Sequence, residues 1–163
     1  NRTQIRLESL SNSLESQFTE PEVPSKSSLA QASSTKILIV DDNDELRTFL
    51  KDALQNEYLI IEAENGQLGY EQAKQHQPDL IISDVMMPVM NGVEATIQIR
   101  KLNDIFKANI PIVAMTANAG AAEIKACMDA GMNDTLIKPF ALSSLISLLN
   151  LHLYNQKNND YEI

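Results

Sequence analysis

The sequence predicts an α/β protein with a doubly wound, five-stranded parallel sheet and helices on both faces. The first observation is a set of short, continuous apolar runs, such as residues 37–40 and 80–82, which are typical of strands buried on both faces. The second is that stretches with apolar residues at helical spacing separate these runs. Parallel strands joined by right-handed helical crossovers are the simplest solution for such an alternation, and they form a three-layer sandwich.

Five runs are expected as strands, namely residues 37–40, 58–61, 80–82, 112–115 and 135–137. The central run, 80–82, ends on the carboxylate of Asp84, and Pro88 shortly afterwards requires a turn. Pro111 comes directly before the fourth run, and residues 58–61 combine β-branched and aromatic side chains. The strands are therefore short and separated by clear turn signals.

Each strand is followed by an expected helix whose apolar residues share one face. These residues are Leu46, Phe49, Leu50 and Leu54; Leu68, Tyr70 and Ala73; Val93, Ala95, Ile97 and Ile99; Ala121, Ile124 and Met128; and Leu142, Leu145, Ile146, Leu149 and Leu153. Asp42 or Asn43 is suited to cap the first helix, and Asn–Gly pairs at 65–66 and 91–92 open the second and third. Gly131 is placed to end the fourth helix in a left-handed conformation.

The 163 residues are enough for one domain of ordinary size, which we expect over residues 36–154. Residues 1–35 are expected to be a linker or the tail of an upstream module, because 25–35 are small and polar. Within them, residues 1–20 fit either a short amphipathic helix or a terminal strand. Residues 155–163 are expected to form a polar C-terminal tail that frays.

The composition excludes several functions. A net charge of −9 and a pI near 4.6 disfavour direct binding to nucleic-acid phosphates. The single cysteine, Cys127, rules out an internal disulfide and fits a packed thiol in a reducing compartment. No apolar stretch approaches the ~20 residues of a membrane span. We therefore expect a cytoplasmic location without membrane contact by this fragment, and membrane anchoring of the parent protein is left open.

Side chains that can bind a metal ion or a phosphoryl group follow four of the five expected strands. Asp41 and Asp42 follow the first, Asp84 the third, Thr116 the fourth and Lys138 the fifth. Each alone is ordinary, but the carboxyl ends of parallel strands meet at one edge of a sheet. Three carboxylates in one place favour a hard divalent cation such as Mg²⁺. With the lysine and the hydroxyl, they predict a site that holds a phosphoryl group while Asp84 attacks phosphorus.

Four motifs carry a resemblance to a known family: ILIVDD at 37–42, DVMMPVMNG at 84–92, MTANA at 115–119 and KPF at 138–140. Over residues 36–153 the chain resembles the receiver domain of two-component signalling, most closely the C-terminal receiver of a hybrid sensor histidine kinase. The resemblance implies a flavodoxin-like fold with strand order 2-1-3-4-5. It also implies a phosphoacceptor module in a phosphorelay, which is no enzyme beyond its own phosphoryl transfer and autodephosphorylation.

The resemblance assigns roles to the residues of the site. Asp84 is the expected phosphoacceptor, and Asp41 and Asp42 are the acidic pair that binds Mg²⁺ with Asp84 and the backbone carbonyl of Met86. Thr116 is the expected switch hydroxyl. Lys138 is expected to contact the phosphoryl oxygens, and its bond to the following proline is a candidate cis peptide.

Partners and output also follow from the resemblance. The expected donor is the dimerisation and phosphotransfer domain of a histidine kinase, and a histidine phosphotransfer protein is an expected acceptor. Docking is expected on the first helix, at Asp44, Glu45, Arg47, Thr48 and Lys51. The family usually carries Tyr or Phe where this chain has Thr135, so a switch that depends on a rotating aromatic in the fifth strand is not available here.

Two other functions fit parts of the pattern. The first is a magnesium-dependent phosphohydrolase with an aspartyl-phosphate intermediate, which usually needs a second Asp two residues after the nucleophile. Met86 stands at that position, and no inserted cap segment is present to enclose a substrate. The second is a degenerate receiver that serves only as an interaction module, which Thr135 leaves open.

Overall fold

A computed structural model describes residues 34–159, so the expectations for residues 1–33 and 160–163 lie outside the described residues. The strands form one parallel sheet in the order β2-β1-β3-β4-β5. Their bounds are β1 Lys36–Val40, β2 Leu59–Ala63, β3 Leu80–Asp84, β4 Ile112–Thr116 and β5 Asp134–Ile137. The predicted sheet and its strand order are confirmed.

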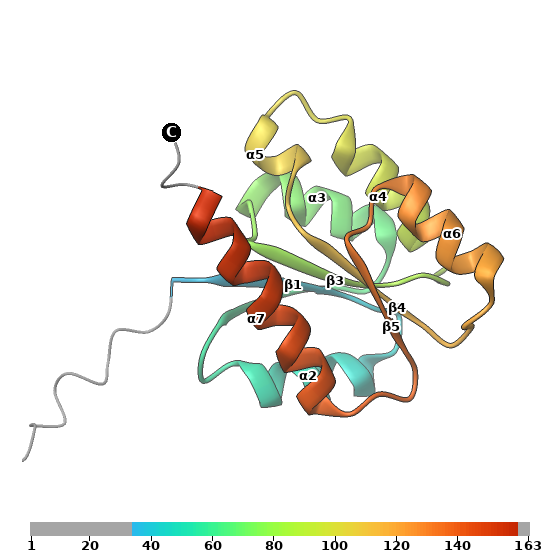
Figure 1. The fold of residues 1–163 in the computed structure, drawn as a ribbon, viewed down its shortest axis with the longest axis horizontal. Coiled ribbons are helices and arrows are strands. Elements are labelled where there is room, and N and C mark those ends of the chain that lie inside the picture. Colours follow the sequence, from blue (N-terminus) through green and yellow to red (C-terminus); the bar gives the residue numbers. More distant parts are fainter. Residues whose placement is uncertain (1–33, 160–163) are drawn as a thin grey trace, which may run out of the picture. The chain divides into compact units, whose positions relative to one another are not determined.

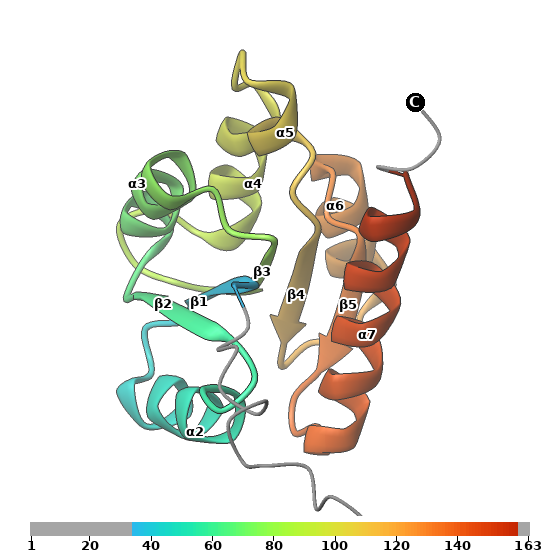
Figure 2. The ribbon, with the colours of Figure 1, turned by 90° about the vertical axis from the view of Figure 1, so that its left-hand side faces the viewer.

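Six helices connect and cover the strands of the described chain. They are α2 Asp44–Leu54, α3 Gly66–His76, α4 Gly92–Arg100, α5 Ile105–Ala108, α6 Ala121–Ala130 and α7 Leu142–Asn159. Helices α2 and α7 lie on one face of the sheet, and α3, α4 and α6 lie on the other (Figures 1 and 2). The predicted three-layer sandwich is therefore present.

Successive residues of the strands fill two separate cores. Ile37 and Ile39 of β1 belong to the core under α2 and α7, where Leu50 and Leu145 are buried. Leu38 instead belongs to the core under α3, α4 and α6. Because adjacent side chains point to opposite faces, a strand covered on both sides must be apolar throughout. This is why the strands appear as continuous apolar runs in the sequence.

Local signals at the helix ends explain where the helices start and stop. The side chains of Asn43, Asn65 and Asn91 accept hydrogen bonds from the first turns of α2, α3 and α4. Asn91 and Glu94 form a complete capping box. Gly131 has φ 103° and ends α6, as predicted from the preference of glycine for left-handed backbone.

Some details differ from the sequence-based expectations. The one-turn helix α5 was not predicted, and α7 continues past Tyr154 to Asn159. The predicted boundaries of the domain at residues 36 and 154 stay a prediction. Phe49 and Met128, assigned to apolar helix faces, are 54% and 47% exposed. The apolar stripes of α2 and α6 are thus narrower than their sequences indicate.

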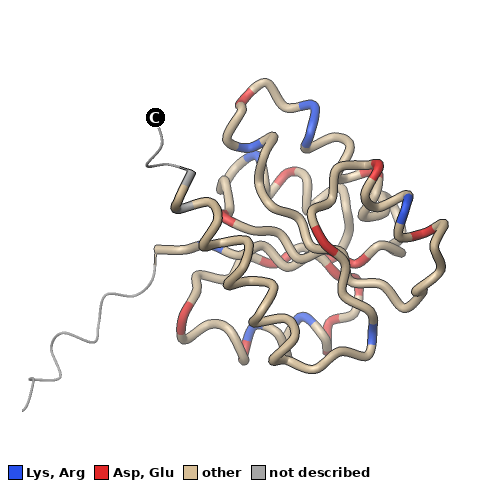
Figure 3. Tube along the Cα trace, in the orientation of Figure 1, with Lys and Arg blue, Asp and Glu red and all other residues tan. Residues whose placement is uncertain are grey.

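Charged residues are distributed over the helices and loops of the described chain. Acidic and basic positions are interspersed rather than gathered into one basic surface (Figure 3). Among the described residues, no helix is both long enough and apolar enough to span a bilayer. The expectation that the chain avoids nucleic acid stays a prediction that depends on its net charge of −9.

Candidate functional site at the carboxyl ends of the strands

The register of the sheet brings the predicted site residues to one edge. Val40 is level with Ser83 in the next strand, so Asp41 and Asp84 follow at neighbouring positions. Asp84 is level with Met115, which precedes Thr116 at the end of β4. Thr116 accepts a backbone hydrogen bond from Lys138, which follows β5, at 2.7 Å. The strand-end argument therefore located all four of these positions correctly.

Three carboxylates converge at this edge. Asp41, Asp42 and Asp84 each offer an oxygen that lies within 4.8 Å of the others. Asp41 is fully buried and Asp84 is 8% exposed, whereas Asp42 is exposed to solvent. Buried carboxylates are costly unless cations or hydrogen bonds compensate them. Oxygen-only donors in a cluster open on one side fit Mg²⁺, which keeps some of its water ligands in proteins.

Lys138 supplies part of this compensation. Its Nζ lies 3.0 Å from Oδ2 of Asp41 and 3.4 Å from Oδ1 of Asp84. The other oxygen of Asp41 accepts a hydrogen bond from the backbone N–H of Asn43 at 2.8 Å. The lysine therefore bridges two carboxylates and presents a positive charge beside Asp84. The peptide bond between Lys138 and Pro139 is cis, as the resemblance implies.

The electrostatic environment of Asp84 opposes its charged form. Burial, followed by repulsion from Asp41, raises the pKa of Asp84 above its usual range. Lys138 and the hydrogen bond from the N–H of Val85, at 2.9 Å, oppose this rise. A cation among the carboxylates would favour the ionised form of Asp84, which is the form that can act as a nucleophile.

Thr116 lies in the site but its hydroxyl is already engaged. Thr116 is 1% exposed, and its hydroxyl donates to Oε1 of Glu123 at 2.5 Å. It also accepts a hydrogen bond from the N–H of Asn118 at 3.0 Å. Glu123, in the first turn of α6, was not identified from the sequence, because no motif there links it to Thr116.

The docking surface predicted on α2 needs a correction. Asp44, Glu45 and Thr48 are exposed, but the side chain of Arg47 is only 13% exposed. Arg47 donates to the carbonyl of Asp41 at 2.5 Å and pairs with Asp44. Lys51 pairs with Glu62 of β2 at 2.8 Å. Arg47 thus supports the loop that carries Asp41, because its guanidinium group donates to the backbone carbonyl of Asp41.

The loop after Asp84 lies against α4 with almost no space between them. The N–H of Gly92 donates to the carbonyl of Val85 at 2.9 Å. A Cβ at Gly92 would lie 2.2 Å from the carbonyl oxygen of Asp84 and 3.0 Å from Oγ of Ser83. Only glycine permits this approach of the helix to the end of β3.

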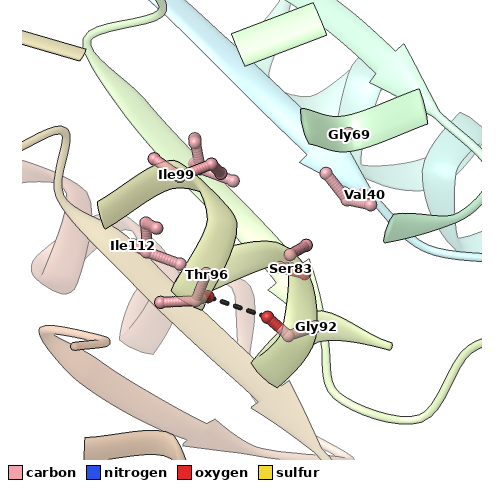
Figure 4. A pocket seen from close by; sticks show the side chains of 9 residues that line it. Val40, Gly69, Ser83, Gly92, Thr96, Ile99 and Ile112 are labelled. Carbon is pink, nitrogen blue, oxygen red and sulfur yellow. Dashed lines mark hydrogen bonds between the residues drawn. The ribbon is translucent and has the colours of Figure 1, made fainter. Parts of the chain in front are cut away.

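A small cavity of about 10 Å³ lies beneath this contact (Figure 4). Val40, Gly69 and Ile112 contribute to its lining, together with two hydroxyl groups. The hydroxyl of Thr96 donates to the carbonyl of Gly92 at 2.8 Å, and that of Ser83 donates to the carbonyl of Asp84 at 2.9 Å. Both buried hydroxyls are therefore satisfied, and they fix the backbone on either side of the contact.

Replacement of Gly92 by Ala is expected to lower the free energy of unfolding by about 2 kcal/mol, since the backbone of Asp84 has to move. Urea denaturation followed by circular dichroism measures this change. Gln98→Ala, at an exposed position of the same helix, is the control and is expected to stay close to wild type. An unchanged unfolding midpoint for Gly92→Ala would show that the contact is not tight.

The domain combines a five-stranded parallel sheet in the order β2-β1-β3-β4-β5 with three carboxylates that converge at the carboxyl ends of its strands. The family model described as the response regulator receiver domain matches residues 37–150. The chain belongs to this family. Receiver domains of two-component systems act together with histidine kinases or phosphotransfer partners.

Three similar proteins support the assignment of the chain to this family. The chain is 38% identical over 112 residues to histidine kinase P4 of Formosa agariphila, which is 69% of this chain and 8% of the kinase. It is 33% identical over 116 residues to the chemotaxis protein CheY of Halobacterium salinarum, which is 71% of this chain and 93% of that protein. The chain spans 54% of the response regulator MprA of Mycobacterium ulcerans. The larger relatives thus contain much sequence that has no counterpart in this match.

Solved structures show the same fold. The receiver domain of the sensor histidine kinase PA1611 from Pseudomonas aeruginosa PAO1 has 32% identity and a TM-score of 0.68, with 74% of this chain and 98% of that chain covered. That structure holds a magnesium ion in its active site cleft. CheY4 of Vibrio cholerae has 29% identity and the same TM-score, with 73% and 98% covered.

Proposed function

We propose that the domain accepts a phosphoryl group from a phosphohistidine onto Asp84 and passes the signal on by phosphotransfer or by a conformational change. The observation that carries this proposal is the position of Asp84. Asp84 is 8% exposed, and its carboxylate lies beside two further carboxylates and 3.4 Å from the ammonium group of Lys138. A nucleophile next to a fixed cation is suited to attack an anionic phosphoryl group.

In this reaction an oxygen of Asp84 forms a bond to phosphorus as the bond between phosphorus and the histidine nitrogen breaks. The electron pair of the broken bond stays on the imidazole. Lys138 stabilises the charge that develops on the phosphoryl oxygens, because its ammonium group is already held between two carboxylates. The hydroxyl of Thr116 binds another phosphoryl oxygen once it is free to do so.

Asp41, Asp42, Asp84 and the carbonyl of Met86 would hold Mg²⁺. The convergence of three carboxylates supports the first three assignments, and the structure of the PA1611 receiver contains a magnesium ion in its active site cleft. Bound Mg²⁺ would neutralise the charge shared by the carboxylates and the phosphoryl group. The buried Asp41 pairs with Lys138 at 3.0 Å and accepts a hydrogen bond from the N–H of Asn43 at 2.8 Å.

The donor is proposed to be the dimerisation and phosphotransfer domain of a histidine kinase, and the parent protein a hybrid histidine kinase. The similarity to histidine kinase P4 supports this parent. A histidine phosphotransfer protein is the proposed next carrier. Asp44, Glu45 and Thr48 remain as an exposed docking surface on α2, beside the half-exposed Phe49.

Incubation with acetyl phosphate and Mg²⁺, followed by intact-protein mass spectrometry, tests this function. One added phosphoryl mass is expected, which maps to the peptide that contains Asp84 and disappears when Mg²⁺ is chelated. Beryllium fluoride binding, followed by calorimetry, is the parallel measurement, because it detects the site even if the phosphoaspartate hydrolyses rapidly. Absence of both signals in a folded protein would contradict the proposal and favour a receiver that serves only as an interaction module.

A further inference from the structure

The carboxylate of Glu123 is the closest hydrogen-bond partner of the Thr116 hydroxyl. Their oxygens are 2.5 Å apart, and Thr116 is buried. A hydroxyl has one proton to donate. The carbonyl of Asn118, at 3.3 Å, is a longer and uncharged alternative acceptor. Since hydrogen bonds to charged acceptors are the stronger ones, the proton of Thr116 is directed towards Glu123.

The first turn of α6 explains why Glu123 is available for this contact. In α4, Glu94 stands three residues after the N-cap Asn91, and its carboxylate accepts from the N-cap N–H at 3.0 Å. Glu123 has the same place relative to the N-cap Gly120 of α6. There, however, the N–H of Gly120 donates to Oδ1 of Asn118 at 2.8 Å. The carboxylate of Glu123 is therefore not needed as a cap and bonds Thr116 instead.

We propose that Glu123 is a positioning residue that holds the hydroxyl of Thr116 in the resting state and must release it before Thr116 can bind the phosphoryl group. This inference rests on the proposed function, because it presupposes a phosphoryl group on Asp84. Phosphorylation then competes with an existing charged hydrogen bond. If the phosphoryl group binds only when the hydroxyl of Thr116 has been released, the free energy of that release lowers the apparent affinity for the group.

Release of Thr116 also affects the loop that leads to α6. The hydroxyl accepts from the N–H of Asn118, whose side chain in turn holds the N-cap Gly120. The N-cap residue of α6 is Gly120, which has no side chain and therefore cannot cap the first turn of the helix with a side-chain hydrogen bond. Rotation of Thr116 therefore removes contacts from both the loop and Glu123. This gives the domain a route from Asp84 to α6 that does not need an aromatic residue at position 135.

The test uses isothermal titration calorimetry in the presence of Mg²⁺. It compares the affinities of the wild type and of two variants for beryllium fluoride, an analogue of the phosphoryl group. Glu123→Ala is expected to bind about tenfold more tightly than wild type, because the competing acceptor is gone. Asp129→Ala is the matched control, since it removes the same charge from an exposed position of the same helix. Its affinity is expected to remain that of wild type.

A double-mutant cycle separates positioning from a general effect on folding. In a Thr116→Ala background, Glu123→Ala is expected to leave the affinity unchanged, because no hydroxyl remains to be held. Equal affinities of Glu123→Ala and wild type, an equal gain in Asp129→Ala, or a gain that persists without Thr116 would each overturn the inference. Failure of the wild type itself to bind beryllium fluoride would instead refute the proposed function, on which the inference depends.

Discussion

Asp84→Asn is expected to take up no phosphoryl group from acetyl phosphate under conditions in which the wild type acquires one. Asparagine has nearly the same shape, but its amide oxygen carries no charge and is a poor nucleophile. Intact-protein mass spectrometry measures the adduct directly. Asp129→Asn, which changes an exposed carboxylate outside the site, is expected to react as the wild type does. An adduct of equal yield on Asp84→Asn would refute the assignment of the phosphoacceptor.

The same variant is expected to be more stable than the wild type at neutral pH without Mg²⁺. Burial and the neighbouring Asp41 raise the pKa of Asp84, so the folded protein binds a proton more readily than the unfolded chain does. The wild type therefore loses stability as the pH rises from the unfolded value of about 3.8 through the raised pKa. The difference between the two proteins should vanish at lower pH, where Asp84 is neutral in both states. Urea denaturation at pH 3 and pH 7 checks both points.

Lys138→Ala is expected to slow phosphoryl uptake by about a hundredfold, the usual effect of removing one preorganised group that stabilises developing charge. It also removes the cation that lies 3.0 Å from the buried Asp41 and 3.4 Å from Asp84. The carboxylates then repel each other without the opposing charge of the lysine. We therefore expect Lys138→Ala to bind Mg²⁺ more tightly than the wild type while it reacts more slowly.

Lys125→Ala is the control for this prediction, because it deletes an exposed lysine that pairs only with Asp129 among the described salt bridges. Uptake is followed by mass spectrometry over time, and Mg²⁺ affinity by calorimetry. Slower uptake together with weaker Mg²⁺ binding would indicate a collapsed site rather than the loss of one cation. An unchanged rate would remove Lys138 from the reaction.

The sheet and the location of the site could be predicted because they depend on short-range patterns. Strand segments such as residues 80–82 must be apolar when both faces are covered, so they stand out in the sequence. Parallel strands then place the residues that follow them at one edge, as found for Asp41, Asp84 and Thr116. These inferences need only the order of the elements.

Contacts set by loop conformation could not be predicted in this way. The bond from Thr116 to Glu123 depends on how the intervening turn folds, and no periodicity encodes that turn. Arg47 was assigned to the surface, but a long side chain can fold back onto the carbonyl of Asp41. The single turn of α5 is too short for a helical period, although Asp104 caps it. Such contacts depend on the three-dimensional path of the loops and on side-chain conformation.

Cys127 gives this domain a built-in chemical reporter. It is the only cysteine of the chain, it is fully buried, and burial followed by the charge of Glu123 raises the pKa of its thiol. A thiol reagent therefore reacts only when α6 separates from the sheet, because the reactive species is an exposed thiolate. The labelling rate of the unmodified protein measures how often that separation occurs. Opening of α6 can thus be timed without introducing a cysteine by mutation.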